Sequence, residues 1–463
     1  MTGSRKKTAL NRLLSDYGML PVLILLCILF SVLTLKEQTV TGAAGAEQVA
    51  RQLDSEPPTQ PDFLMVTAGG KDELEFSRGF SKSCEERGWS LTAVSGDPST
   101  VRAALARIDS TGGGNYVIVT TSAYRPLVEQ IVPQFPSLAT SPVLSPASRR
   151  WPTFLLAENL RNVANQITVI AIIAIGMTMV IIAAGIDLSV GSLIALSAVV
   201  IAWIIEPLGG AAVSSGGVVV AALAAMGVCA AIGAFSGIMI TSFRIPPFIA
   251  TLAMMQVAAG LAYIISQGKP IYQLPEGFVW LGRGVDPVFG LPIAVIMMFL
   301  MYFIAWVVME RSVLGRHVYA VGGNPEAARL AGIRVNRVLL FVYTLCGLLA
   351  GLGGIIMASQ LRSGAPTYGL TYELYVIAAV VVGGTSLSGG EGKIISTLIG
   401  AFIIGVIQNG MNLTNIESYT QKVVLGLVIL AAVLFDRIKQ RGLKRSIGFL
   451  KPTISKDRES TLP

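Results

Sequence analysis

One carboxylate in this sequence lies between two long uncharged runs, an unusual position for a charged group. Asp187 occurs in the segment GIDLSVGS at 185–192. A carboxylate near hydrocarbon costs several kcal/mol unless it has a partner. Either Asp187 or Ser189 caps a broken helix whose backbone groups would otherwise lack partners, or both lie beside a pathway and bind hydroxyl groups of a solute. Replacing Asp187 with alanine damages the protein in both cases, but only the second hypothesis predicts lost transport at normal abundance.

Amide side chains inside or at the ends of apolar runs form a second group of candidates. An amide donates and accepts hydrogen bonds, so it can bind a solute hydroxyl, but it can equally bind a neighbouring helix. Together with Asp187 and Ser189, the predicted residues of a translocation pathway are Asn162, Gln166, Gln256 and Asn409.

Residues suited to catalysis or metal binding are scarce. His317 is the only histidine, which excludes His-based triads and His metal clusters. Three of the four cysteines lie inside apolar runs and Cys84 stands alone in the polar segment 36–155, so neither a disulfide framework nor a metal site is expected. We therefore predict no catalytic residue, no metal and no cofactor in this chain.

The glycine-rich segment 383–393 (GGTSLSGGEGK) contains LSGGE, which resembles the signature of ABC ATPases, next to a Gly-Lys pair. A phosphate-binding loop requires G-x-x-x-x-G-K-[ST], but here Leu387 occupies the place of the first glycine and Ile394 follows Lys393. We therefore predict a glycine-rich turn between two apolar runs, and we expect ATP and Mg to be bound by a separate protein.

These residues belong to a sequence with the composition of a membrane protein. Hydrophobic residues make up 53% of the chain, and only 23 charged residues fall within 156–436. Ten uncharged runs come close to or exceed the roughly 20 residues that a membrane-crossing helix needs. They are 17–35, 162–186, 188–205, 207–243, 245–268, 287–309, 338–361, 374–390, 394–416 and, interrupted only by Lys422, 418–435. Since continuous runs exclude a β-barrel, we predict an all-α polytopic membrane protein with about ten transmembrane helices.

The distribution of basic residues predicts the orientation. An even number of helices places both termini on one side, and assigning that side to the cytoplasm gives it 19 basic residues and leaves four to the short outer loops. The net charge of +8 is then explained mainly by the basic residues of the cytoplasmic loops and tails, so no nucleic-acid surface is expected. The predicted parts are a cytoplasmic tail 1–16, a first transmembrane helix 17–35, an outer segment 36–155, a membrane domain 156–436 and a basic cytoplasmic tail 437–463. A cleavable signal peptide is the alternative for the first helix, because the small residues GAAGA follow at 42–46.

The outer segment has the composition of a soluble domain, with 13 acidic and 11 basic residues. Its start, from Thr39 to Pro61, is rich in Gly, Pro, Gln and Ala and is predicted to be a linker. Hydrophobic patterns then predict alternating strands and helices, with Ser99 as a helix cap: strands 63–67, 89–94 and 116–120, and helices 72–87, 99–109 and 125–132. The order βαβαβα implies a small parallel sheet with right-handed crossovers.

Residues 60–135 resemble the first lobe of periplasmic sugar-binding proteins of the ribose-binding type, in EFSRGFSKSCEERGWSL and in the strand YVIVT. That family usually carries an aromatic-containing loop after its first strand, whereas this sequence has AGGKDELEF and no second lobe. Because one lobe cannot close around a ligand, we expect a tethered docking or regulatory domain, with an inert insertion as the alternative.

The sequence from Glu158 to Asp436 resembles the permease subunits of bacterial ABC importers of the ribose, xylose and autoinducer-2 class. The matching stretches include AIGMTMVIIAAGIDLSVGSLIALS, LGRHVYAVGGNPEAARLAGIRVN and YELYVIAAVVVGGTSLSGGEGKIISTLIGA. The resemblance implies a non-enzymatic permease in the bacterial inner membrane that imports a ribose-like monosaccharide or related polyol by alternating access. It also implies three partners: a second permease subunit, a cytoplasmic ABC ATPase and a periplasmic sugar-binding protein.

The basic loop before residue 338 carries the signals of a short helix. Asn324 can cap it, Pro325 suits its first position, and Gly332 can end it. By resemblance this helix is the element that couples to the ATPase, and the predicted coupling residues are Gly323, Asn324, Glu326, Ala327, Arg329 and Gly332. The alternative is an interfacial connector whose charge merely follows the positive-inside rule.

Two rival functions stay open. A secondary, ion-coupled transporter should carry several intramembrane carboxylates, but Asp187 is nearly alone and Glu373 lies at the edge of a run. A membrane sensor with an outer ligand-binding domain would need a cytoplasmic output module, but only a short basic tail follows Asp436. The identity of the solute is not predicted by any of these patterns.

Overall fold

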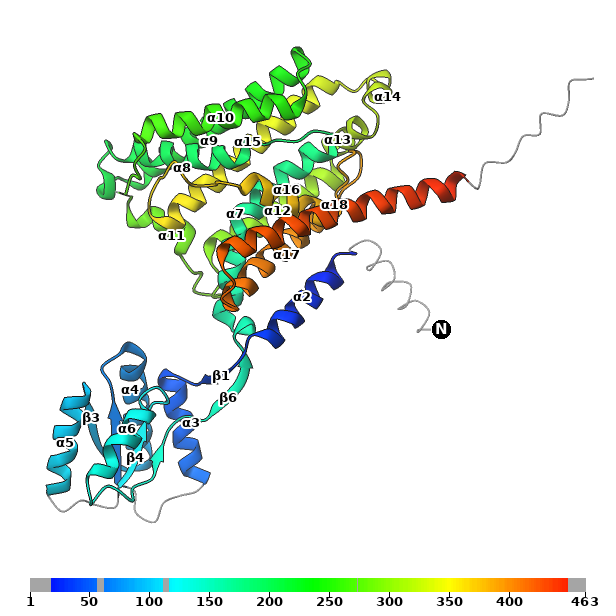
Figure 1. The fold of residues 1–463 in the computed structure, drawn as a ribbon. Helices are drawn as coiled ribbons and strands as arrows, with labels where there is room; N and C mark the ends of the chain where they lie inside the picture. The colour runs from blue at the N-terminus through cyan, green and yellow to red at the C-terminus, as the bar shows by residue number, and fades with distance from the viewer. Residues whose placement is uncertain (1–17, 56–61, 111–115, 273, 449–463) are drawn as a thin grey trace, which may run out of the picture. The chain divides into compact units, whose positions relative to one another are not determined.

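The chain folds into two units in a computed structural model that describes residues 18–55, 62–110, 116–272 and 274–448, with side chains described as far as residue 434. The first, the α/β unit, comprises Thr34–Thr153. The second, the helical unit, combines Met1–Leu33 with Phe154–Pro463. Figure 1 labels most of the helices and strands of both units.

The α/β unit is built around a parallel sheet of four strands in the order β3-β2-β4-β5. In its register, Leu64 of the central strand lies opposite Thr92 on one side and Ile118 on the other. The predicted alternation of strands and helices is confirmed, and a short fourth strand, β5, adds to it. The elements are β2 (Asp62–Thr67), α4 (Lys71–Arg87), β3 (Ser90–Ser95), α5 (Pro98–Ser110), β4 (Tyr116–Thr120), α6 (Arg125–Ile131) and β5 (Val143–Leu144).

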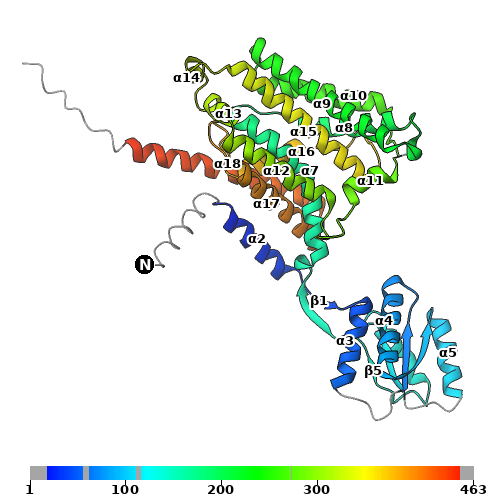
Figure 2. The same ribbon diagram turned by 180° about the vertical axis from the view of Figure 1, so that it is seen from behind.

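Helices cover both faces of this sheet, because successive side chains of a strand point to opposite faces. Phe63 and Met65 of β2 are buried with Phe80 of α4. Leu64, between them, is buried on the other face with Leu105 of α5. The two cores explain why β2 is buried along nearly its whole length, and Figure 2 shows the helices on either side of the sheet.

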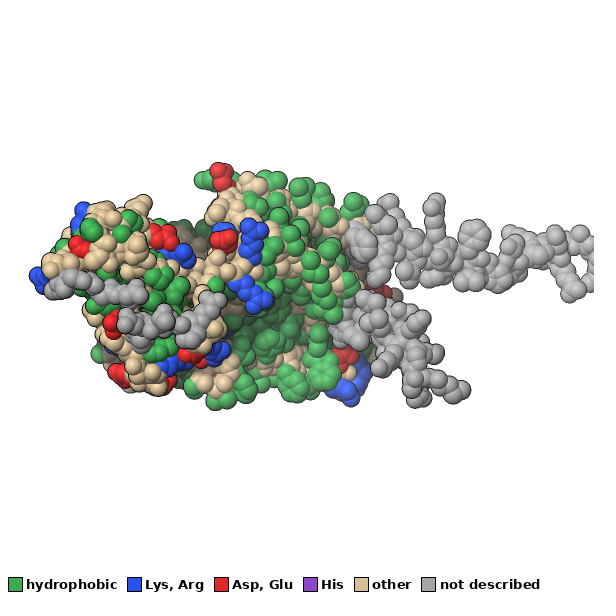
Figure 3. All heavy atoms as spheres, turned by 90° about the horizontal axis from the view of Figure 1, so that it is seen from below, with side chains coloured by type: hydrophobic (Ala, Val, Ile, Leu, Met, Phe, Trp, Pro, Cys, Tyr) green, Lys and Arg blue, Asp and Glu red, His purple; other side chains and the backbone are tan. Residues whose placement is uncertain are grey.

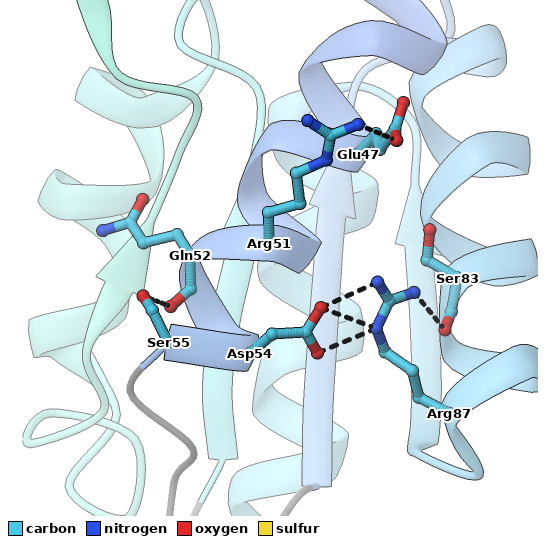
Figure 4. A network of polar contacts seen from close by, with 7 residues as sticks. All are labelled: Glu47, Arg51, Gln52, Asp54, Ser55, Ser83 and Arg87. Atoms are coloured by element: carbon cyan, nitrogen blue, oxygen red, sulfur yellow. Dashed lines mark hydrogen bonds and ion pairs between the residues drawn. The ribbon is translucent and has the colours of Figure 1, made fainter.

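The linker predicted from Thr39 to Pro61 is wrong over most of its length, because Gly42–Ser55 forms helix α3. Its apolar residues recur at helical spacing and are buried against α4: Ala46, Val49, Ala50 and Leu53. At its last turn Asp54 accepts bonds of 2.8 to 3.1 Å from Arg87 of α4, which also donates to the carbonyl of Ser83 (Figure 4). Residues 56–61 of the predicted linker lie outside the described residues.

Two smaller features of the α/β unit also differ from expectation. Asp97, and not Ser99, caps α5, since its Oδ1 accepts hydrogen bonds from the backbone N–H groups of Ser99 (2.9 Å) and Thr100 (2.8 Å). The unit also begins and ends in an antiparallel ribbon that was not predicted, formed by β1 (Leu35–Thr39) and β6 (Ser148–Pro152).

Each of the ten uncharged runs contains an apolar helix, and six of these helices are long and apolar enough to cross a membrane. The six are α7 (Ala157–Ile182), α9 (Ser215–Ser242), α10 (Pro247–Ser266), α12 (Ile293–Arg311), α15 (Val335–Leu361) and α17 (Ile394–Leu413). The other four are shorter in their described apolar part: α2 (Leu20–Leu33), α8 (Val190–Ile205), α16 (Tyr372–Val382) and α18 (Ser418–Gly448). The predicted domain boundary at Asp436 falls inside α18, and the predicted tail 1–16 lies outside the described residues.

Two breaks interrupt the long helices and matter for the site. Residues 183–189 separate α7 from α8, and Ala184 there has a left-handed backbone (φ +61°). The run 374–390 is helical only to Val382, because the glycines that follow include Gly384, Gly389 and Gly390, all with positive φ. The expected glycine-rich turn at 383–393 therefore forms.

Helix α7 lies at the centre of the helical unit, buried from Ile167 to Ile182. Helix α15 packs closely along α9, where a Cβ on Gly347 would lie 3.2 Å from the Cα of Gly233. Small residues at such a contact let two helices approach closely in lipid. Broad hydrophobic surfaces cover the outer helices, as Figure 3 shows for one face.

Candidate functional site

Two short helices mark opposite ends of the helical unit. Helix α14 (Pro325–Leu330) comes just before the first residue of α15, whereas α11 (Glu276–Arg283) packs against its last turn, where the N–H of Gly282 donates to Ser359 Oγ at 2.7 Å. Helix α7 runs between the same ends, since Asn165 near its start donates to the carbonyl of Gly282. We call them the α14 end and the α11 end (Figures 1 and 2).

The six predicted coupling residues lie together at the α14 end. Asn324 Oδ1 accepts hydrogen bonds of 3.0 Å from the N–H groups of Glu326 and Ala327, and so caps α14 as predicted. Arg329 forms an ion pair with Glu326 at 2.6 Å, and Gly332 takes a left-handed backbone (φ +84°) just after the helix. The local structure of the loop is thus as expected, and its role in coupling stays a prediction.

Leu330 is a prominent feature of α14 that the sequence reasoning missed. It is 91% exposed, although it is a large apolar residue. Ala328 is buried beneath the helix, and residues two apart point to nearly opposite sides of an α-helix, so Leu330 is directed outward. With the exposed Ala327 and Ala331 it forms an apolar tip on α14. The sequence carried only a weak signal of this exposure: Ala328 and Leu330 lie two positions apart, so they cannot both lie on the buried face of the helix.

A groove of about 1170 Å³ adjoins α14 and is strongly basic. It is lined by residues from the end of α9, from α14 and from the start of α15, among them Arg244, Arg329, Arg334 and Arg337. Within the described part of the chain, Arg329 alone of these four arginines forms an ion pair. The α14 end therefore presents an apolar tip beside a positively charged groove.

Asp187 is fully buried at the break between α7 and α8. Its Oδ1 accepts hydrogen bonds from Ser189, 2.9 Å from the backbone N–H and 2.6 Å from the hydroxyl, one residue before α8 begins at Val190. The other oxygen, Oδ2, has no hydrogen-bond partner among the described residues, and the thiol of Cys346 is a polar neighbour of the carboxylate. Asp187 therefore accepts from one backbone N–H group at the break, as the capping hypothesis expects, whereas the side chain of Ser189 accepts no hydrogen bond from the first turn of α8.

The predicted amide residues do not form one cluster. Asn162 and Gln166 are exposed and lie one turn apart on α7, whereas Gln256 is exposed on α10. Asn409 of α17 is half-buried and bonds to Asn159 of α7, a residue that the sequence analysis did not select. Asn409 therefore joins two helices, which is the alternative left open for these amides.

Comparison with known proteins places this chain among transport permeases. The model of the family described as "Branched-chain amino acid transport system / permease component" matches residues 159–433. The chain is 46% identical over 293 residues to the ribose import permease protein RbsC of Escherichia coli (strain K12), an alignment that covers 62% of this chain and 88% of that protein. No solved structure matches the chain significantly.

Permeases for other sugars are also similar to this chain. The L-arabinose transport system permease protein AraH of Escherichia coli (strain K12) is 40% identical over 296 residues, which is 64% of this chain and 87% of that protein. The D-allose transport system permease protein AlsC of the same strain is 36% identical over 289 residues, or 62% of this chain and 85% of that protein.

Proposed function

Because this chain belongs to the branched-chain amino acid transport system permease family, we propose that it is the membrane-spanning subunit of an ATP-driven importer for a ribose-like monosaccharide or related polyol. The relatives named for ribose, L-arabinose and D-allose support a sugar as the solute, although the family description names amino acids. A pair of permease subunits would work with a cytoplasmic ABC ATPase, which binds ATP and Mg, and with a periplasmic sugar-binding protein.

The apolar tip of α14 is the observation that carries the coupling role. An isolated exposed leucine costs free energy in water, and protein interfaces are built around such apolar anchors within a polar rim. Leu330 is flanked by the Glu326–Arg329 ion pair, and the basic groove adjoins it. In this proposal α14 docks on the ATPase through Leu330 and Ala327, while Gly323, Asn324 and Gly332 set the shape of the loop.

The charge at the two ends supports a cytoplasmic position for the α14 end. It carries Arg244, Arg311, Arg316, Arg329, Arg334, Arg337 and Lys393, whereas the α11 end carries fewer basic residues among those described, including Arg161, Lys269, Arg283 and Arg362. Basic loops stay on the cytoplasmic side during insertion. In this orientation α7 starts on the outer side, so the α/β unit, which precedes it in the chain, is periplasmic.

We infer that all ten apolar helices belong to the membrane domain and that the first of them is retained. Phe30 of α2 lies against the ring of Phe154, with 6.2 Å between ring centroids, and a side chain on Gly410 of α17 would overlap it. Small residues of this kind let helices approach closely in lipid. This close packing supports a retained α2 over a cleaved signal peptide.

For the pathway we propose Asn162 and Gln166, with Gln256 from α10 as a further candidate. All three side chains are exposed in the single chain, and no hydrogen bond engages them within its described part. Asp187, Ser189 and Asn409 would act indirectly by holding α8 and α17 in place.

The pathway would change sides by alternating access when ATP-driven closure displaces α14. The α/β unit would serve as a docking domain for the sugar-binding protein.

Uptake into proteoliposomes tests the function. Permease, ATPase and binding protein are reconstituted together and given radiolabelled ribose, L-arabinose, D-allose or leucine. We expect sugar uptake that requires ATP and the ATPase and persists when the proton gradient is collapsed. Uphill uptake by the permease alone would establish secondary transport instead, and uptake of leucine without sugar would reassign the solute.

The docking role is tested by Leu330→Asp, with Leu74→Asp on the exposed surface of α4 as the matched control. Loss of an interface anchor typically weakens binding by about 30-fold. We expect that loss of ATPase affinity for Leu330→Asp and unchanged affinity for Leu74→Asp. Equal affinity for both variants would reject α14 as the docking element.

A further inference from the structure

The glycine-rich loop 383–393 is a compact structure with no role in the function described so far. The N–H of Ser386 donates to the carbonyl of Glu391 at 3.1 Å, so the loop closes on itself. At its tip Gly389 and Gly390 have φ values of +82° and +75°, which bulkier residues rarely adopt. A closed loop with glycines at its tip exposes its backbone to whatever lies next to it.

The neighbours of this tip are the last residues of α7 and of α13 (Val313–Gly323). The N–H of Gly390 donates to the carbonyl of Ile182 at 2.8 Å. A Cβ on Gly322 would overlap the same carbonyl and lie 2.7 Å from the nitrogen of Gly390. A Cβ on Gly390 would lie 2.8 Å from the Cα of Gly323. Three chain segments thus meet through their backbones, in a contact that we call the glycine joint (Ile182, Gly322, Gly389 and Gly390).

One side chain fastens the glycine joint to α13. The hydroxyl of Tyr319 donates to the carbonyl of Gly392 at 2.8 Å. Since α14 starts at Pro325, the joint lies directly before the element that we propose to dock on the ATPase. The joint also lies directly before the α7–α8 break, where the carbonyl of Ile186 is contacted by Thr251 of α10.

We propose that the glycine joint transmits displacement of α14 to the break between α7 and α8. Closely packed backbones cannot yield as flexible side chains do, so a small shift of α13 moves the end of α7 directly. Packed contacts of this kind switch between discrete arrangements, and the break gives α8 and α10 a point about which to re-tilt. The inference rests on the proposed coupling role of α14, and it assigns the loop 383–393 a mechanical function.

Two glycines provide a matched pair of variants. Gly322→Ala places a methyl group inside the joint, whereas Gly227→Ala, on α9 and away from α14, places it in open space at an ordinary backbone conformation. The full permease is reconstituted with its ATPase and binding protein, and ATPase affinity, ATP hydrolysis and solute uptake are measured together. For Gly322→Ala we expect normal ATPase affinity and about tenfold less uptake per ATP hydrolysed. Gly227→Ala should behave like the unmodified protein.

A gentler variant covers the case in which Gly322→Ala fails to accumulate. Tyr319→Phe removes one hydroxyl and keeps the ring, and we expect about threefold less uptake per ATP at unchanged ATPase affinity. The proposed role of the glycine joint would be overturned if Tyr319→Phe, and any Gly322→Ala protein that accumulates, showed normal uptake per ATP. Unchanged ATPase affinity in Leu330→Asp would reject the coupling role of α14, on which the joint proposal depends. Lost ATPase affinity in Leu330→Asp, together with normal uptake per ATP in the joint variants, would reject the glycine joint alone.

Discussion

Asn159 and Asn409 exchange two amide hydrogen bonds, of 3.0 and 2.9 Å, between α7 and α17. The two residues are 250 positions apart, and each amide acts as donor and acceptor to the other. Asn159 also donates to the carbonyl of Phe154 at 2.8 Å. The pair therefore fixes the start of α7 to the end of α17.

We predict that the two asparagines are coupled in stability and not in solute binding. In a double-mutant cycle with Asn159→Ala and Asn409→Ala, the coupling free energy should be about 0.6 to 1.5 kcal/mol, as for other amide pairs in membranes. Thermal unfolding in detergent measures it, and the KM for uptake should stay constant. A raised KM at unchanged stability would return Asn409 to the pathway.

Asp187 should tolerate replacement by asparagine better than by alanine. The bonds at this position do not require a charge, since the amide oxygen of an asparagine can still accept both bonds from Ser189, whereas Asp187→Ala leaves the buried N–H of Ser189, just before α8, without its acceptor. We expect Asp187→Asn to keep abundance and transport within about threefold of the unmodified protein and Asp187→Ala to lose abundance. Membrane fractions are assayed for both quantities. Normal abundance with abolished transport in Asp187→Asn would support the pathway role.

Helix α3 should contribute to the stability of the α/β unit. Leu53 is 4% exposed, and replacing a buried leucine with alanine costs about 2 to 4 kcal/mol. Gln52→Ala, on the exposed side of the same helix, should cost less than about 0.5 kcal/mol. Urea titrations followed by labelling of Cys84 distinguish the two variants. Identical midpoints would mean that this segment behaves as the linker predicted from composition.

Cys84 should react slowly with maleimides until the α/β unit unfolds. It is 1% exposed, and burial raises the pKa of its thiol to about 11. Because the pKa is higher in the folded state, this group favours folding below about pH 9, and that contribution is lost as the pH rises toward 11. Labelling is measured by peptide mass spectrometry at pH 8 and pH 10, with and without urea. A native labelling rate equal to that in urea at pH 8 would contradict the buried position.

Local signals account for the parts of the structure that were predicted correctly. The strands of the α/β unit combine apolar runs with flanking glycines, and α14 has its cap, its proline and its terminal glycine within a few positions. Helix α3 was missed because its Gly- and Ala-rich composition resembles a linker, and it is stabilised by packing on α4. Its apolar spacing was present, but spacing alone does not show that a partner surface exists.

The candidate site depended more on tertiary structure. Sequence patterns identified Asp187 and the loop around Glu326, but they could not choose between capping and solute binding, since both use the same oxygen atoms. The Asn159–Asn409 pair has no local signal, because it depends on which faces of two distant helices meet. The exposure of Leu330 likewise depends on which side of α14 is packed.

The two ends of the α/β unit meet, with the N–H of Thr153 donating to the carbonyl of Thr34 at 3.0 Å beyond the β1–β6 ribbon. An insertion whose ends touch can be gained or lost by an ancestral gene without stretching the polypeptide on either side. The relatives align with only about 62% to 64% of this chain, which agrees with such a cassette. Excising 35–152 and joining the two threonines through a short glycine bridge should therefore yield a permease that still inserts, and the same junction could accept a foreign domain.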